Sequence, residues 1–173
     1  MLSILKFAAD PNDTLPAITF WLMGSFASSG SAQITFILLP FLLGTGLLYL
    51  FRWKLNILSL GDDEAKIAGV HPKLVKSIVL GAATVLIASA VTVSGMIGWV
   101  GLVIPHATRK IIGSNHGYVL PLSSVFGALF MLLSDTFART IGFSEIPIGI
   151  ITSLTGAPLF ALLFLFKDAS VHE

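Results

Sequence analysis

Cysteine is absent from the 173 residues, and charged residues make up only 11% of them. Without thiols, disulfide bonds and thiolate metal sites are excluded. The net charge of +1 and the lack of basic tracts interleaved with aromatic residues give no support to nucleic-acid binding. The sequence also has no GxxxxGK[ST] phosphate loop, no HExxH zinc pair and no GxSxG nucleophile turn. It therefore indicates neither an enzyme nor a protein with a resident cofactor.

Hydrophobic residues are abundant instead, at 55% of the chain against about 45–50% in soluble domains. They form long apolar runs, and a helix needs about 20 such residues to cross the hydrocarbon layer. The composition of the runs favours helices over the alternating strands of a barrel. We predict an all-α, polytopic helical membrane protein whose residues 1–173 form a single transmembrane domain. The five expected spans are 34–51, 77–96, 97–112, 118–138 and 148–166.

The span at 97–112 is short, and only Gly95 and Gly98 separate it from the preceding span, so the two could form one long bent helix. If it crosses separately, the loop 52–76, the corner 109–117 and the tail from 167 share one side of the membrane. That side then holds eight of the ten Lys and Arg residues: Arg52, Lys54, Lys66, Lys73, Lys76, Arg109, Lys110 and Lys167. By the positive-inside rule this side is cytoplasmic, and we expect the span to run inward.

Polar residues mark the expected cytoplasmic end of this span. Pro105 removes a backbone donor and is expected to kink the helix. Arg109 and Lys110 can snorkel to the lipid headgroups. His106 has no second ligand at metal spacing, so a histidine at headgroup level is favoured over a residue of a transport pathway or an interface.

Two shorter elements are expected beside the spans. Residues 15–27 are apolar but too short to cross, and Trp21 suits the boundary, so they indicate an interfacial helix on the outer side. Residues 145–154, with Pro147 near the start and Gly156 further on, suggest a broken entry into the last span.

Two helix faces carry recognisable spacing. Ala90, Ser94 and Gly98 form a stripe of small residues, which is typical of close helix packing within the chain and also of subunit interfaces. Asp135 and Arg139 are four residues apart, in the order that suits an intrahelical ion pair. A structural pair is favoured here over a proton relay.

The loop at 55–77 is the most informative stretch. Three acidic residues at 62–64 suit the positive end of a helix dipole, and Gly69 can end that helix. Pro72 can occupy the first turn of a second short helix that ends at Lys76. The pattern of helix, glycine turn and helix predicts a rigid docking element for a cytoplasmic partner.

Four motifs together resemble the carboxy-terminal half of the FecCD-type permeases, the membrane subunits of ABC importers for iron siderophores, haem and cobalamin. They are LNILSLGDDEAKIAGV (55–70), GWVGLVIPHATRKIIGSNH (98–116), LPLSSVFGALFMLLSDTFART (120–140) and EIPIGIITSLTGAPLF (145–160). The resemblance runs from about residue 19 to residue 166, with the motifs in the family's order.

This resemblance implies part of a type II ABC importer permease, homodimeric or paired, in the lipid of the bacterial cytoplasmic membrane. Such a permease receives its substrate from a periplasmic or lipoprotein binding protein and sits on two ABC ATPase subunits. The loop at 55–77 matches the family's cytoplasmic coupling helices, which implies an ATPase-coupling role for Gly61, Asp62, Glu64, Ala65, Gly69 and Pro72. An iron-siderophore complex is the expected cargo, with cobalamin, haem and oxyanions as alternatives.

The family's earlier helices have no counterpart here, so a partner fragment that supplies them is expected to be required for transport. Two other classes stay open. A secondary transporter or small channel would place polar residues at a midplane site, whereas the predicted spans hold only Asp135, near an end. A non-transporting truncated remnant or membrane scaffold would also account for a shortened front.

Overall fold

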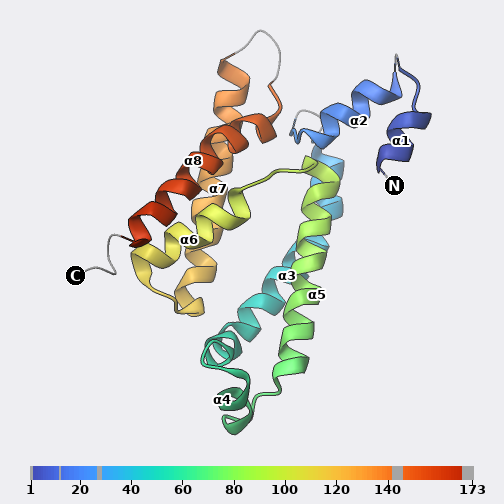
Figure 1. The fold of residues 1–173 in the computed structure, drawn as a ribbon. Helices are drawn as coiled ribbons and strands as arrows, with labels where there is room; N and C mark the ends of the chain where they lie inside the picture. The colour runs from blue at the N-terminus through green and yellow to red at the C-terminus, as the bar shows by residue number, and fades with distance from the viewer. Residues whose placement is uncertain (1, 12, 27–28, 142–145, 169–173) are drawn as a thin grey trace.

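The computed structural model of the chain describes residues 2–11, 13–26, 29–141 and 146–168, with only the backbone described at residues 2, 5 and 164–168. Within these ranges the chain forms α-helices and no strands (Figure 1), which confirms the all-α prediction. In chain order the helices are α1 (Leu2–Ala8), α2 (Thr14–Leu22), α3 (Ser31–Leu58), α4 (Asp62–Ile67), α5 (Pro72–Ser94), α6 (Val100–Ile112), α7 (His116–Thr140) and α8 (Ile148–Asp168).

Three of the described helices, α3, α5 and α7, are long and apolar enough to cross a membrane, and the part of α8 whose side chains are described, Ile148–Leu163, is also apolar. Each coincides with an expected span. The remaining expected span is represented by α6, whose 13 residues extend about 20 Å, less than the hydrocarbon thickness of about 30 Å. The non-helical residues 95–99 join the end of α5 that is away from α4 to the beginning of α6 (Figure 1).

Glycine geometry separates α5 from α6. Gly95 has φ 69° and follows the last residue of α5, and Trp99, also at φ 69°, precedes α6. The alternative of one long bent helix is therefore wrong. Gly98 lies in the extended segment between the helices, so the small-residue stripe predicted on one helix face ends at Ser94.

The helices form two groups. α3 and α5 lie side by side (Figure 1). Gly44 of α3 is buried, and a Cβ atom there would overlap the side chain of Leu86 in α5. The second group consists of α6, α7 and α8, and α7 also contacts α3. Glycine at position 44 thus permits the close approach of the two long helices.

Hydrogen bonds place three segments on the same side of the bundle. Asn56, near the end of α3, bonds to Asn115 at the α6–α7 corner. Lys110, near the end of α6, donates from Nζ to the carbonyl oxygen of Leu163 in α8 at 2.7 Å. The loop carrying α4, the α6–α7 corner and the end of α8 therefore lie together, as expected if α6 runs toward the loop side. That this side is cytoplasmic stays a prediction.

Several predicted boundaries are wrong. α3 continues seven residues past 51, to Leu58. No separate short helix ends at Lys76, because α5 runs unbroken from Pro72 to Ser94 and nothing after Pro72 interrupts its backbone hydrogen bonds. α2 ends at Leu22 rather than at residue 27.

The break expected in the last span is absent from its described part. α8 continues through Gly156. Gly156 lies against the side chain of Trp99, and a Cβ atom at position 156 would collide with that side chain. Gly156 thus allows α8 to pack closely against Trp99, and it does not interrupt the helix. Glu145, where the broken element was expected to begin, lies outside the described residues.

Candidate functional site at the α4 end of the bundle

The acidic first turn of α4 is tied to α5. Asp62, Asp63 and Glu64 occupy this turn, where the helix dipole favours negative charge. Nζ of Lys76 in α5 lies 2.6 Å from Oδ1 of Asp62. Because both side chains are about half exposed, this bond contributes about 1 kcal/mol or less to the stability of the loop.

Gly61 and Gly69 shape the two ends of α4. Gly61 precedes the helix with φ 134°, and a Cβ atom there would overlap the carboxylate of Glu64. Gly69 follows the helix with φ 75°. The backbone N–H of Gly69 donates to Lys66 and that of Val70 to Ala65, at 3.0 and 2.8 Å, which is a Schellman turn. The predicted glycine end of the first helix is confirmed.

A small apolar core holds α4 against its neighbours. Ala65, Val70 and Val75 are buried together, and Phe51, Ile57, Leu58 and Val79 pack around them. Pro72, the first residue of α5, is buried as well. Ala65 and Pro72 thus face inward, so their side chains are not available for contact with another protein.

The exposed apolar residues at this end were not predicted from the sequence. Ile67, the last residue of α4, is 89% accessible, and Leu60 and Leu74 on either side of α4 in the sequence are also exposed apolar side chains. Asp63 and Lys66 form an exposed ion pair at 2.7 Å on the same short helix. A helix of six residues gives no clear periodicity, so the sequence alone did not separate its inner face from its outer face.

The opposite end of the bundle has a glycine junction that the sequence analysis also missed. Gly24, Gly95 and Gly149 bring the end of α2, the end of α5 and the start of α8 into backbone contact. A Cβ atom at Gly149 would collide with the carbonyl oxygen of Met23, and one at Gly95 with that of Trp21.

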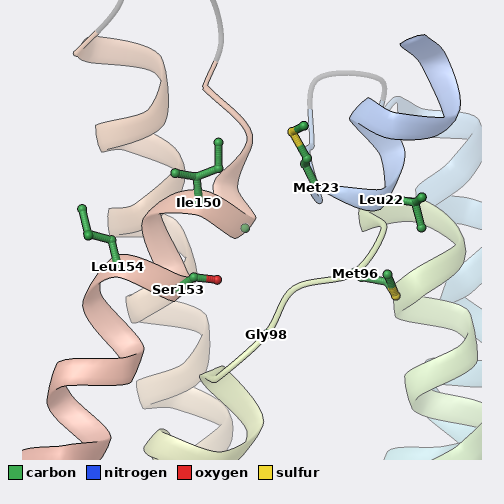
Figure 2. Close-up of a pocket in the computed structure, with 8 residues that line it drawn as sticks. Leu22, Met23, Met96, Gly98, Ile150, Ser153 and Leu154 are labelled. Atoms are coloured by element: carbon green, nitrogen blue, oxygen red, sulfur yellow. The ribbon is translucent and has the colours of Figure 1, made fainter. Parts of the chain in front are cut away.

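A pocket of about 560 Å³ lies beside this junction, at the end away from α4. Figure 2 shows it between the start of α8, the end of α2 and the extended segment after α5. Its lining residues are Leu22, Met23, Met96, Gly98, Gly149, Ile150, Ser153 and Leu154. Gly98 therefore lies at this pocket rather than on the face of α5.

The residues predicted at the end of α6 lie along one short helix. Pro105 is inside α6, and Arg109 is in its last turn. The ring of His106 contacts Phe160 of α8 edge-on, with centroids 6.2 Å apart. Among the described residues no group of three His, Cys, Asp or Glu side chains could hold a metal ion.

The other predicted pairs are also located. Nε of Arg139 lies 2.9 Å from Oδ2 of Asp135 within α7, on the side away from α4. Oγ of Ser94 donates to the carbonyl oxygen of Ala90 at 2.9 Å, so the buried serine satisfies its donor within α5. These contacts show geometry, and the structural roles assigned to the residues stay predictions.

Comparison with known proteins gives consistent matches. A model of the FecCD transport family matches residues 1–166. The chain is 45% identical to the molybdate import system permease protein MolB of Haemophilus influenzae. The alignment covers the whole of this chain and 52% of MolB. It is 41% identical to a probable iron chelatin transport system permease protein of Helicobacter pylori. That alignment covers 96% of this chain and 51% of the relative.

One solved structure also matches closely. It is an inward-facing structure assigned to a metal-chelate type ABC transporter, with a TM-score of 0.90 and 45% identity. The match covers 95% of this chain and 53% of the other. The chain thus spans about half the length of the relatives it matches.

Proposed function

The chain belongs to the FecCD transport family, whose members are membrane transport subunits rather than enzymes, and from this premise we propose that it acts as the second half of an ABC importer permease. Its multi-pass character follows from the three membrane-capable helices and the family. We place it in the bacterial cytoplasmic membrane, with the α4 end in the cytoplasm.

The observation that supports this proposal most directly is the shape of the α4 end. A rigid helix pair, closed by a Schellman turn and a buried core, presents Ile67 and two leucines outward. An apolar side chain held rigidly at the end of a membrane bundle is suited to fill a pocket on a soluble partner. In an ABC importer that partner is the ATPase subunit.

Co-purification with the candidate ATPase tests this contact. Burial of an isoleucine side chain contributes about 1.5–3 kcal/mol, so Ile67→Asp is expected to lower recovery of the ATPase about tenfold or more. Ile141→Asp is the matched control, because Ile141 is 67% exposed and lies at the opposite end of α7. Equal recovery with both variants would contradict α4 as the docking element.

The other proposed partners follow from the same arrangement. A periplasmic or lipoprotein binding protein would deliver substrate at the end away from α4, where the pocket beside Gly149 lies. A second permease subunit, identical or paired, would complete the translocation path. The matches cover about half of each relative, and helices equivalent to the other half would complete the permease.

For the cargo we propose an iron-siderophore complex or a related metal chelate. The relative from Helicobacter pylori and the solved metal-chelate type transporter support this class. Molybdate is a second candidate, because the 45% identity to MolB extends over the whole chain.

Uptake in a host lacking its own permeases separates these cargoes. The chain would be expressed with its ATPase, binding protein and the complementary permease half, and supplied with a labelled iron-siderophore complex or labelled molybdate. Uptake of molybdate alone would overturn the proposed cargo and keep the permease function. Uptake of neither, with the ATPase bound, would favour a non-transporting membrane scaffold.

A further inference from the structure

A cluster of hydrogen bonds joins the end of α3 to the beginning of α7. Nδ2 of Asn56 donates to Oδ1 of Asn115 at 2.8 Å. Oδ1 of Asn56 accepts the backbone N–H of His116 at 2.7 Å and lies 3.0 Å from the Nδ1 atom of the same residue. A single amide side chain therefore contacts two residues about 60 positions further along the chain.

The chemistry of the partners defines the orientation of the Asn56 amide. A backbone N–H can only donate, so the amide oxygen faces His116 and the amide nitrogen faces Asn115. Oδ1 of Asn115 also accepts the N–H of Gly117 at 2.8 Å, which caps α7. The first N–H groups of a helix have no acceptor within the helix. Asn115 supplies an acceptor for the N–H of Gly117, and Asn56 supplies one for the N–H of His116.

Asn56 also belongs to the segment that holds α4. The next two residues, Ile57 and Leu58, pack against the core formed by Ala65, Val70 and Val75. Only residues 59–61 separate the end of α3 from the beginning of α4. A displacement of α4 therefore acts on the turn of α3 in which Asn56 lies.

Beside the amide cluster, the loop and the α6–α7 corner are not packed tightly together. A hollow of about 370 Å³ lies between them, lined by Asn56, Ile57, Ser59, Leu60, Ser114 and Asn115. Displacement is transmitted poorly across a gap wherever the side chains on its two sides are not in contact. The hydrogen bonds of Asn56 cross from the loop side to α7 at this gap.

We propose that Asn56 is a positioning residue that transmits displacement of α4 to the amino terminus of α7. The inference rests on the proposed function of α4 as the docking element for an ATPase. With the amide in place, the end of α3 and the start of α7 move as one body. Without it, α4 moves against the hollow and α7 does not follow.

The test uses the transporter assembled from this chain, the complementary permease half in cysteine-free form and the ATPase. The chain carries Ser153→Cys as a reporter in the pocket away from α4, and it has no cysteine of its own. The rate at which a polar maleimide labels position 153 is measured with and without ATP and vanadate. A coupling free energy in the usual range predicts that nucleotide changes this rate about fivefold or more.

Adding Asn56→Ala is expected to abolish most of the nucleotide-dependent change in labelling, while ATPase binding and ATP hydrolysis persist. Ser59→Ala is the matched control, because Ser59 lines the same hollow and its hydroxyl bonds to the Asn56 carbonyl within the same helix end. If Asn56→Ala does not assemble, Asn56→Asp replaces it, since aspartate keeps the acceptor for His116 and loses the donor to Asn115.

A full nucleotide response in the Asn56 variant would overturn the inference and leave the proposed function intact. Failure of the chain with Asn56 unchanged to bind the ATPase or to respond to nucleotide would instead count against the proposed function. Loss of the response with both Asn56→Ala and Ser59→Ala would also overturn the inference, because the effect would then not be specific to the amide.

Discussion

The backbone N–H of Val70 donates to the carbonyl oxygen of Ala65 at 2.8 Å, and both residues are buried in the same core. Gly69 stands immediately before Val70 with φ 75°, a conformation that costs other residues energy. The turn between α4 and α5 therefore depends on one glycine, and the exposed position of Ile67 depends on that turn.

Gly69→Ala is expected to destabilise the loop by about 1–2 kcal/mol, because an alanine in the left-handed region is strained even where its methyl group has space. Recovery of the ATPase with the purified chain should fall as the turn opens. Gly81→Ala is the control, since Gly81 lies within α5 beside open space in the described structure, and alanine is favoured there. Equal recovery for the two variants would show that the turn does not position α4.

Gly149→Ala is expected to destabilise the opposite end of the bundle. The added methyl group would collide with the backbone carbonyl of Met23, which cannot move without shifting the end of α2. Forced overpacking typically costs about 1–3 kcal/mol. Thermal unfolding of the purified chain measures the loss, and Gly127→Ala, at an open position within α7, serves as the control. A Gly149 variant as stable as the control would contradict the backbone contact between α8 and α2.

The sequence allowed prediction of the features that depend on neighbouring residues. The long helices α3, α5 and α7 follow from their apolar runs, and the α4 turn follows from three acids, Gly69 and Pro72. Contacts between distant segments could not be predicted in this way. Gly149 stands in an apolar run, and no neighbouring residue indicates why glycine is needed there. The need arises from the contact between the start of α8 and the end of α2.

The same limit applies to the candidate site. Asn56 and Asn115 are both ordinary polar residues near predicted helix ends. Nothing in the residues around either one indicates that the two side chains are hydrogen-bonded to each other. Ala65 and Ile67 are two apolar residues in one short helix, yet one is fully buried and the other almost fully exposed. Which face of α4 is outward depends on its packing against α3 and α5, which the local sequence does not specify.

Asp135→Asn tests the structural role of the ion pair in α7. The side chains of Asp135 and Arg139 are 24% and 47% exposed, so the pair contributes about 0.2–1 kcal/mol, and the variant should show a small loss of thermal stability. Transport per molecule of protein should remain unchanged. Thr136→Ala, which removes a hydroxyl bonded within the same helix, is the control. Loss of transport at an unchanged protein level would indicate a proton relay instead.

The orientation of the bundle can be tested with single cysteines, because the chain contains none. The bonds between Asn56, Asn115 and His116 hold the α4 loop and the α6–α7 corner together, so Lys66→Cys and Lys110→Cys should react from the same side. If the basic residues gathered there face the cytoplasm, a membrane-impermeant maleimide should not label either position in intact cells and should label both after the membrane is opened. Thr140→Cys, at the other end of α7, should be labelled in intact cells. Labelling of position 66 or 110 from outside would show that the bundle has the opposite orientation. α4 would then be out of reach of any cytoplasmic ATPase, whatever its exposed face contacts.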